Sequence, residues 1–334
     1  MPTHKIKAVI YDPNDNRFML KTIAKPGLET PFDVMVEVSA VGLNPVDAKI
    51  NHWVSMVEPT NRDIVGGLDV SGTIVAKGSQ VYNWNIGDHV LYHGDMRRRQ
   101  GGFAPLCVHD SRTLTKHPNI SAVQAAASPC AGWTAFRALN DKLLCSIKES
   151  ILIYGASGGV GSYALQLCRY FNFKTIIAVC SEQNFEYAYS LGATHCVDYQ
   201  DPQIRAKISF ITNAQGLDCI IDCVGGPAQK LTSTMLGFDG QLVELVSTID
   251  SSQHQNMFER GLSLSQLSLG SGHVYGEKGK HSITQAGTKM NMLLEKQIIC
   301  PPHITTITIN DIPEQLEQMR QGHSKGKYVA IAKH

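Results

Sequence analysis

The feature that most constrains this chain is a glycine-rich turn between an apolar strand pattern and a helical pattern. The segment ILIYGASGGVGSYALQL, residues 151–167, has the spacing A-x-G-x-x-G, with Ala156 where the strict dinucleotide fingerprint has its first glycine, then Gly158 and Gly161. Gly158 would let backbone N–H groups approach a pyrophosphate at the positive N-terminus of the helix, and Gly161 would let the helix pack close to the strand. The segment therefore predicts a dinucleotide-binding site.

The surrounding sequence repeats this strand–turn–helix order. The runs ESILIYG, KTIIAVC, HCVD, LDCIIDCVGG and GQLVELV are each short and apolar, and helical patterns separate them. Such alternation is typical of a parallel sheet with helices on both faces. We therefore expect a Rossmann doubly wound domain over residues 121–299.

Residues 1–120 have a different character. Apolar and polar residues alternate with period two in VMVEVSAV, and glycine or aspartate punctuates the short runs, which favours antiparallel strands in a barrel-like domain. Residues 300–334 become strand-like again in HITTITIND and KYVAIA. We assign this tail to the first domain, which makes that domain discontinuous and the fold class α/β.

Charge and composition narrow the class of partner. The chain has 30 basic and 29 acidic residues, a net charge of +1, so it has no broad field for nucleic acid or an anionic membrane. The longest apolar runs fall well short of the ~20 residues of a membrane span, and the start lacks the apolar core of a signal peptide. The nine cysteines are scattered and contain no C-x-x-C pair, which favours reduced thiols. We expect a soluble cytoplasmic protein with a small-molecule partner.

The residues after the second predicted strand bear on the choice of cofactor. An acid at this strand tip would bind the adenosine ribose 2′-hydroxyl and repel a 2′-phosphate. Here the tip carries Cys180 and Ser181, and the nearest acid, Glu182, falls just beyond, where it also suits the first turn of a helix. We therefore expect NADPH rather than NADH.

Five segments carry a family resemblance. They are VSAVGLNPVDAKI (38–50), GLDVSGTIVAKGS (67–79), SPCAGWTAFRAL (128–139), GASGGVG (155–161) and GHSKGKYVAIA (322–332). With the order of elements they resemble the medium-chain dehydrogenase/reductase superfamily, in its zinc-independent quinone oxidoreductase branch. The resemblance implies a GroES-like antiparallel β-barrel domain beside the Rossmann domain, metal-free hydride transfer, and a homodimer in which GQLVELV and its successor LSQLSLG pair across subunits.

Many relatives of this superfamily are zinc alcohol dehydrogenases, so the metal positions need separate inspection. Their catalytic zinc takes Cys, His and Cys from three segments. The corresponding positions here are Asn44, Leu68 and Cys130, and the segment LYHGDMRRRQGGF, where a structural zinc lobe would lie, contains no cysteine. His89 and His93 stand isolated in the sequence. We expect no zinc.

The resemblance also implies site residues. Asn44 would donate a hydrogen bond to the acceptor oxygen, Asp47 would orient the site, and Trp53 would wall the substrate cleft; a turn that satisfies its own backbone, and simple packing of the tryptophan, are the alternatives. Cofactor contacts are implied for Thr134, Gly155, Ala156, Ser157, Gly158, Gly159, Val160, Gly161, Ser181, Asn184 and Tyr199. Asn184 stands where the family has a basic residue. Lys327 and His323 are expected to serve packing or the subunit surface.

These points predict an NADPH-dependent oxidoreductase that transfers a hydride to a quinone or small α,β-unsaturated carbonyl without metal. One alternative is a zinc alcohol dehydrogenase with substituted ligands. Another is a dinucleotide-binding sensor or accessory protein with little catalysis. The arginine run at 97–99 is expected to lie in a solvated loop, with contact to an anionic substrate as the alternative.

Overall fold

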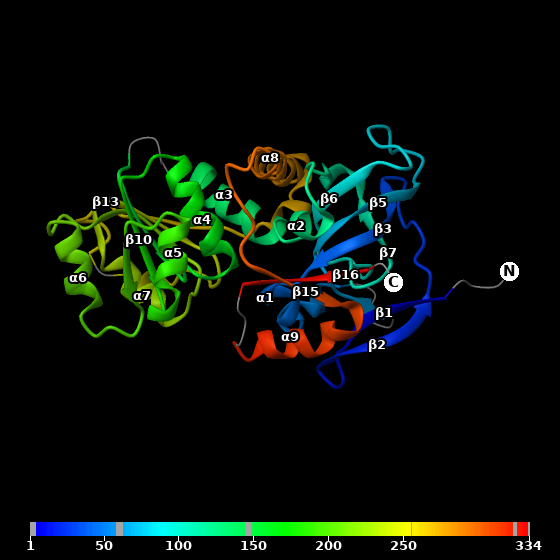
Figure 1. Cartoon of the computed structure of the whole chain (residues 1–334), viewed down its shortest axis with the longest axis horizontal. Coiled ribbons are helices and arrows are strands. Elements are labelled where there is room, and N and C mark those ends of the chain that lie inside the picture. Colours follow the sequence, from blue (N-terminus) through cyan, green and yellow to red (C-terminus); the bar gives the residue numbers. More distant parts are fainter. Residues whose placement is uncertain (1–4, 58–62, 144–147, 255, 323–325, 333–334) are drawn as a thin grey trace. The chain divides into compact units, whose positions relative to one another are not determined.

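The chain divides into two compact units. The computed structural model describes residues 5–57, 63–143, 148–254, 256–322 and 326–332, drawn in colour in Figure 1. The first unit comprises Met1–Trp133, Leu269–Gln297 and Pro301–His334; the second comprises Thr134–Ser268 and Ile298–Cys300. Residues 121–133 and 269–297, which the sequence prediction gave to the dinucleotide-binding domain, pack with the first unit.

The long helix α8 (Gly276–Glu295) explains why the segment 269–297 packs there. The amide nitrogen of Asn291 donates to Thr115 Oγ1 at 2.9 Å and to the Lys116 carbonyl at 3.0 Å. A Cβ on Gly287 would lie 2.7 Å from the ring of Trp133, so the helix sits directly against that buried side chain. Hydrogen bonds and close packing together hold α8 to the first unit.

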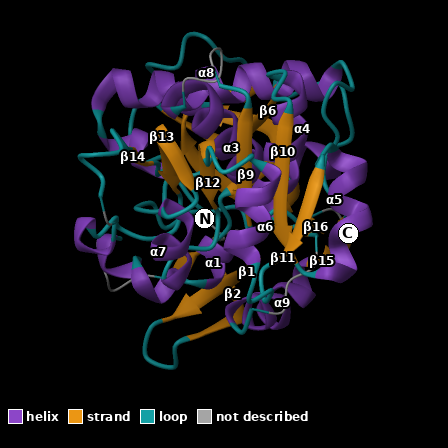
Figure 2. Ribbon diagram, turned by 90° about the vertical axis from the view of Figure 1, so that its left-hand side faces the viewer, coloured by secondary structure: helices purple, strands orange, loops and turns teal. Residues whose placement is uncertain are grey.

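The second unit is a six-stranded parallel sheet. Its strands are β9 (Ser150–Tyr154), β10 (Thr175–Cys180), β11 (His195–Asp198), β12 (Leu217–Asp222), β13 (Leu236–Glu244) and β14 (Ser263–Gln266). They lie in the order β11-β10-β9-β12-β13-β14, which Figure 2 shows across the sheet. Numbered along the chain this is 3-2-1-4-5-6, the Rossmann order. The predicted fold class and its five strands are confirmed, and β14 is the sixth.

Helices precede the first five strands of this sheet along the chain, one before each strand. They are α3 (Thr134–Arg137), α4 (Gly159–Tyr170), α5 (Phe185–Leu191), α6 (Ile204–Ile211) and α7 (Pro227–Ser233). Because the helices cover the sheet, its central strands are apolar on both faces: Ile151, Leu152 and Ile153 of β9 are all fully buried. The carboxyl ends of β9 and β12 are the point where the strand order reverses, which is where such sheets bind ligands.

The first unit is built mainly on antiparallel pairs. Its strands are β1 (Lys5–Asp12), β2 (Arg17–Ala24), β3 (Asp33–Gly42), β4 (Ile64–Val65), β5 (Asp69–Lys77), β6 (His89–His93), β7 (Leu106–Asp110), β8 (Thr115–Lys116), β15 (Ile304–Thr308) and β16 (Lys327–Ile331). Strands β15-β16-β3-β5-β6-β8 form one sheet, with β7 also paired to β3, and β2-β1-β4 form another. Among the described residues these strands make two sheets rather than one closed ring.

The remaining elements of the first unit are short. They are the helices α1 (Pro45–Ala48), α2 (Ala122–Ala126) and α9 (Ile312–Arg320), and the π-helical turn Pro129–Trp133. The expected return of the tail to the first domain is confirmed, because β16 pairs antiparallel with β3 through Val329–Gly42, Ala330–Val41 and Ile331–Ala40. None of the described helices has both the length and the apolar character needed to cross a membrane.

Candidate active site

The turn after β9 has the geometry that the glycine pattern predicts. Gly155 has a φ of +82°, a left-handed conformation that favours glycine, and α4 begins at Gly159 with Gly158 as its N-cap. A Cβ on Gly161 would lie 2.4 Å from the Gly155 carbonyl oxygen and 2.6 Å from Cα of Ala156. Glycine at 161 is therefore required for the close approach of α4 to the turn.

Gly158 has a different reason to be glycine. A Cβ there would meet a single atom of the protein within 4 Å, the Gly155 carbonyl oxygen at 3.3 Å. Its φ of −75° is open to any residue, so backbone strain does not require glycine here, and a Cβ would need the neighbouring carbonyl to move by only a few tenths of an ångström. The missing side chain instead leaves space over the first turn of α4, where unpaired N–H groups and the helix dipole favour an anion. The turn thus fits a dinucleotide pyrophosphate.

Three of the predicted cofactor residues lie together beside this turn. The amide nitrogen of Asn184 donates to Ser181 Oγ at 2.8 Å and to Ser157 Oγ at 3.3 Å. Tyr199, which follows β11, is half-exposed, and its hydroxyl accepts a hydrogen bond from the Gln200 amide. This group provides neutral hydroxyl and amide groups at the edge of the sheet.

An acid that the sequence reasoning missed lies at the same edge. Asp198 ends β11, and its Oδ2 accepts a hydrogen bond from the Glu182 backbone N–H at 2.8 Å. Its Oδ1 accepts from the Gln200 N–H at 2.7 Å. Both carboxylate oxygens are therefore engaged by backbone donors of the chain.

Two further acids that the sequence reasoning missed end the paired strands β12 and β13. Asp222 and Glu244 are opposite each other in the register of β12 and β13, and both are buried. Asp222 Oδ1 accepts from the N–H groups of Val224 and Gly225, and Glu244 Oε1 accepts from that of Ser247. Burial raises the pKa of both carboxyl groups. The pair shapes the two turns that follow these strands.

The first unit holds a buried polar cluster, which we define as Asn44, Asp47, Asp69 and Lys327. Each is at most 3% exposed. Asn44 Nδ2 donates to Asp47 Oδ2 at 3.2 Å and to Asp69 Oδ2 at 3.0 Å. Lys327 Nζ donates to Asp69 Oδ2 at 3.1 Å and to Asn44 Oδ1. Both N–H hydrogens of the Asn44 amide thus have acceptors in the chain.

Asp47 is the member of the polar cluster with an unsatisfied atom. Its Oδ2 accepts from the Asn44 backbone N–H at 2.9 Å, whereas its buried Oδ1 has no hydrogen-bond partner. Burial, followed by the negative charge of Asp69, raises the pKa of Asp47 to about 7 against the opposing effects of Lys327 and Asn44. At neutral pH this carboxyl group is therefore poised between its protonated and ionised forms.

Of the two alternatives expected for Lys327, packing or the subunit surface, the surface position is wrong, because the residue is buried. Its side chain is 4% exposed, forms an ion pair with the fully buried Asp69, and contacts the predicted catalytic turn rather than a surface. It was missed because 258 residues separate Lys327 from Asp69. His323 lies outside the described residues.

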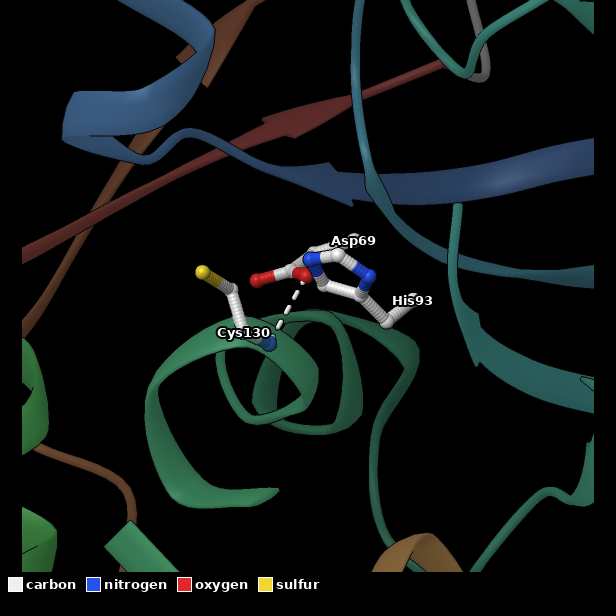
Figure 3. Close-up of side chains that lie close together, drawn as sticks. All are labelled: Asp69, His93 and Cys130. Atoms are coloured by element: carbon white, nitrogen blue, oxygen red, sulfur yellow. Dashed lines mark hydrogen bonds between the residues drawn. The ribbon is translucent and has the colours of Figure 1, made fainter. Parts of the chain in front are cut away.

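His93 is also not isolated. Ligand-type atoms of Asp69, His93 and Cys130 all lie within 4.8 Å of one another, and Figure 3 shows the three side chains converging. Burial, helped by the nearby His273, lowers the pKa of His93 to about 3, so its ring is neutral, and its Nδ1 has no partner. Burial and the charge of Asp69 raise the pKa of the Cys130 thiol.

These three residue types could in principle bind a transition metal, but their surroundings do not fit one. Asp69 Oδ1 already accepts from the Cys130 N–H at 2.8 Å, and Asp69 Oδ2 accepts from both Asn44 and the Lys327 ammonium. A divalent ion at Asp69 would therefore stand beside a fixed positive charge without water to screen it. The site as it stands is closed to such an ion.

Two further predicted residues are buried. Trp53 donates from Nε1 to the Val46 carbonyl at 2.9 Å and lines a small cavity of the first unit together with Leu68, Tyr92 and Met96. Thr134 is buried at the start of α3. Trp53 therefore both packs against the α1 segment and walls a cavity.

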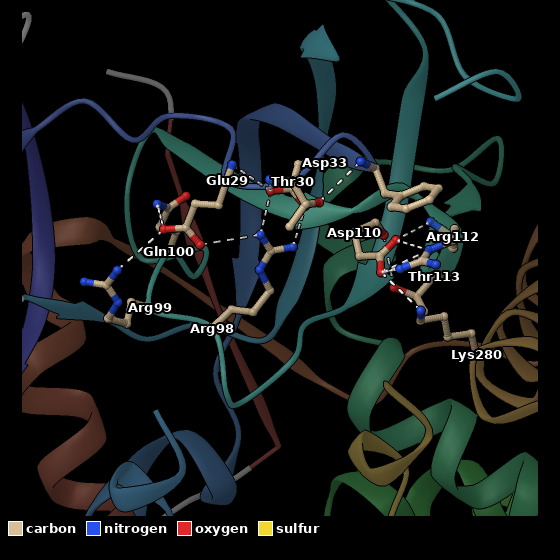
Figure 4. A network of polar contacts seen from close by, with 11 residues as sticks. Glu29, Thr30, Asp33, Arg98, Arg99, Gln100, Asp110, Arg112, Thr113 and Lys280 are labelled. Carbon is tan, nitrogen blue, oxygen red and sulfur yellow. Dashed lines mark hydrogen bonds and ion pairs between the residues drawn. The ribbon is translucent and has the colours of Figure 1, made fainter. Parts of the chain in front are cut away.

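The arginine run does not lie in a solvated loop, so that expectation is wrong. Arg98 forms two parallel hydrogen bonds to the buried Asp33, at 2.8 and 2.7 Å, and Arg99 lies 3.5 Å from Glu29, as Figure 4 shows. Burial alone would raise the pKa of Asp33, but the hydrogen bonds and charge of Arg98 outweigh it and lower that pKa. Arg97 pairs more loosely with Asp95, at 3.6 Å. Arg98 and Arg99 thus anchor the loop to the first unit.

The two glycines of the turn make separable predictions. We expect Gly161→Ala to lower the free energy of unfolding by about 2–3 kcal/mol, because its Cβ collides with backbone atoms. Gly158→Ala should cost under about 1 kcal/mol yet weaken binding of a nicotinamide dinucleotide roughly 10-fold, since its methyl group would occupy the space over the first turn of α4. Urea denaturation and fluorescence titration measure the two effects. Equal effects on stability, or unchanged binding in Gly158→Ala, would contradict this division.

The arginine run gives a second prediction. Arg98→Met should lower the free energy of unfolding by about 2–4 kcal/mol because it leaves the buried Asp33 carboxylate without its charge partner. Arg97→Met is the matched control and should change it by less than about 1 kcal/mol, as is usual for a partly exposed pair. Urea denaturation of both variants measures the difference. Similar losses of unfolding free energy in the two variants would contradict the role of Arg98 as the charge partner of Asp33.

Comparison with known proteins agrees with this architecture. The model of the alcohol dehydrogenase GroES-like domain matches residues 30–128, and the model of the zinc-binding dehydrogenase domain matches residues 159–287. A chloroplast envelope quinone oxidoreductase homolog of Arabidopsis thaliana is 32% identical over 223 residues, 64% of this chain and 66% of that protein. A trans-enoyl reductase of Cordyceps militaris is 28% identical over 96% of both chains.

Solved structures share the fold over nearly the whole chain. The quinone oxidoreductase of Coxiella burnetii has a TM-score of 0.83 at 23% identity, with 99% of this chain and 100% of that chain covered. An alcohol dehydrogenase superfamily protein of Novosphingobium aromaticivorans has a TM-score of 0.85 at 24% identity, with the same coverage. The two domain matches and the relatives named as quinone oxidoreductases show the family. The chain belongs to the medium-chain dehydrogenase/reductase superfamily of oxidoreductases, in its quinone oxidoreductase branch.

Proposed function

We propose that this protein is an NADPH-dependent oxidoreductase that transfers a hydride to a quinone or small α,β-unsaturated carbonyl without a metal ion. The observation that carries the proposal is the buried polar cluster, in which Asp47 has a free carboxylate oxygen and a pKa of about 7. Relatives named as quinone oxidoreductases and as a trans-enoyl reductase support the reaction class.

The second unit would bind the cofactor. Bound NADPH would supply the hydride, and the N–H groups at the start of α4 would hold its pyrophosphate over Gly158. Asn184, Ser157 and Ser181 would receive the adenosine 2′-phosphate through neutral donors, with Tyr199 beside them. The strand-tip residue Cys180 carries no charge to repel that phosphate, and both oxygens of Asp198 are taken by backbone N–H groups.

The first unit would stabilise the acceptor. Hydride addition to a conjugated carbonyl leaves negative charge on its oxygen, which a hydrogen-bond donor or a proton must stabilise. We assign this role to the protonated Asp47 carboxyl, since both N–H hydrogens of the Asn44 amide already have acceptors. Asn44 is then a positioning residue, which holds Asp47 through its backbone and side-chain N–H groups.

One observation favours a second candidate. Asp69, His93 and Cys130 have metal-ligand side chains within 4.8 Å of one another, which is what a zinc alcohol dehydrogenase with substituted ligands requires. The Lys327 ammonium beside Asp69 favours the metal-free reaction instead. Turnover that is lost on treatment with a chelator would select the zinc enzyme.

The cellular compartment and the oligomeric state are also part of the proposal. The described cysteines are free thiols, which suits a reducing cytoplasm. Strand β14 lies at one edge of its sheet, so its outer hydrogen-bonding groups are available to a second copy, and we propose a homodimer. A single-chain mass by light scattering would exclude it.

Initial rates test the proposed reaction. With chelator present, NADPH oxidation should be measured against a panel of quinones, enones and aldehydes, and repeated with NADH. We expect turnover of quinones or enones, a preference for NADPH, and no effect of the chelator. Tight cofactor binding without turnover of any acceptor would instead favour a dinucleotide-binding sensor.

The pH profile tests the role of Asp47. Because the donor form is protonated, kcat should fall as pH rises through about 7. We expect Asp47→Asn to lower kcat on the order of 100-fold and to abolish this dependence. Asp63→Asn, at a partly exposed acid paired with Lys21, is the control and should retain the wild-type profile. A wild-type profile that is flat between pH 6 and 8 (about one unit either side of that pKa) would remove Asp47 as the donor.

A further inference from the structure

Asp69, one of the three side chains of metal-ligand type in the first unit, is paired with a positive charge of the protein, the Lys327 ammonium. Asp69 Oδ2 is 3.1 Å from the Lys327 ammonium, and the side chains of the pair are 0% and 4% exposed. Both groups are therefore shielded from water, so the attraction between them is only weakly screened. A cation is a fixed part of this site.

His93 and Cys130 lie beside Asp69, so three side chains of metal-ligand type are close together. A carboxylate, an imidazole and a thiol are all ligand types that zinc and cobalt accept, and they come from β5, β6 and the π-helical turn Pro129–Trp133. The unpartnered Nδ1 of His93 leaves a lone pair or N–H of a neutral ring unused in a buried place. The three side chains therefore need no change of residue to bind an ion.

We propose that the Lys327 ammonium is an internal cation that takes the place of a divalent metal ion beside Asp69, and that it keeps Asp69, His93 and Cys130 from binding one. Lys327 is a positioning residue in this role: it balances the Asp69 carboxylate and holds Asn44 through Oδ1. The inference deepens the metal-free part of the reaction proposed above: tight Co²⁺ binding by wild-type protein would count against both, whereas a folded Lys327→Gln protein that binds none would count against this inference alone.

The charges of the two states balance. In the present site Lys327 contributes +1 and Asp69 contributes −1, while the Cys130 thiol is neutral. A divalent ion that replaced the ammonium and released the thiol proton would bring +2 against one carboxylate and one thiolate, again with zero net charge. Wild-type protein, in contrast, would keep the Lys327 charge beside the ion, so the same groups would sum to +1 in a buried volume, which disfavours the ion.

Cobalt binding tests the inference directly. Lys327→Gln removes the charge and keeps an amide N–H for Asn44 and Asp69; Lys327→Met removes both. We expect the full-length variants to bind one Co²⁺ on the order of 100-fold more tightly than wild-type protein. Binding should release about one proton per metal and produce the absorption bands of cobalt coordinated by a thiolate.

Three controls separate this effect from a general change. Lys327→Arg retains the cation and should not bind Co²⁺. Lys280→Met removes a lysine that pairs with Asp110 elsewhere in the first unit and should behave as wild type. Adding Cys130→Ser to Lys327→Gln should abolish the thiolate band. Circular dichroism verifies that each variant is folded.

Two results would overturn the inference. One is wild-type protein that binds Co²⁺ as tightly as the variants, with the same thiolate band. The other is a folded Lys327→Gln protein that binds no Co²⁺. If Lys327→Met does not fold, Lys327→Gln decides the question, because its amide N–H groups are the nearest uncharged replacement for the donors of the lysine.

Discussion

The buried ion pair between Lys327 and Asp69 is the contact on which the candidate site depends. It joins β16 to β5, and through the Asn44 amide it reaches the turn before α1. Breaking such a pair by removing one partner strands a charge in a medium that cannot solvate it. Because each member of the polar cluster satisfies another, the arrangement of Asn44, Asp47, Asp69 and Lys327 is fixed as a whole rather than residue by residue.

The two units hold their structural acids through different sets of partners. In the second unit, Asp198, Asp222 and Glu244 end parallel strands and accept hydrogen bonds from backbone N–H groups of the turns beside them. In the first unit, Asp33 and Asp69 also accept from backbone N–H groups, but each is paired in addition with a cationic side chain, Arg98 or Lys327. The first arrangement shapes turns at a ligand-binding edge. The second fastens segments that are distant in the sequence.

The sequence predicts a feature well when the residues that form it lie close together along the chain. The parallel strands and the turn at Gly155–Gly161 were predictable because periodicity and glycine spacing are local. Asn44 and Asp47 were found through a short motif. Asp69, His93 and Lys327 were missed as partners because their contacts join separate strands, and no spacing records that a lysine 258 residues along the chain reaches Asp69. Arg98 was misjudged for the same reason: its partner, Asp33, lies 65 residues earlier.

The position of β16 in the chain has a consequence for protein synthesis. Strand β16 lies between β15 and β3 in its sheet, yet the ribosome makes it after every other described strand of the two units. The second unit is nearly continuous, so it can fold while the first unit still lacks a strand. Until β16 is made, β3 has an unpaired edge at Ala40–Gly42 and Asp69 has no countercharge. The nascent chain therefore passes through a late stage in which one half is finished and the other is open to mispairing.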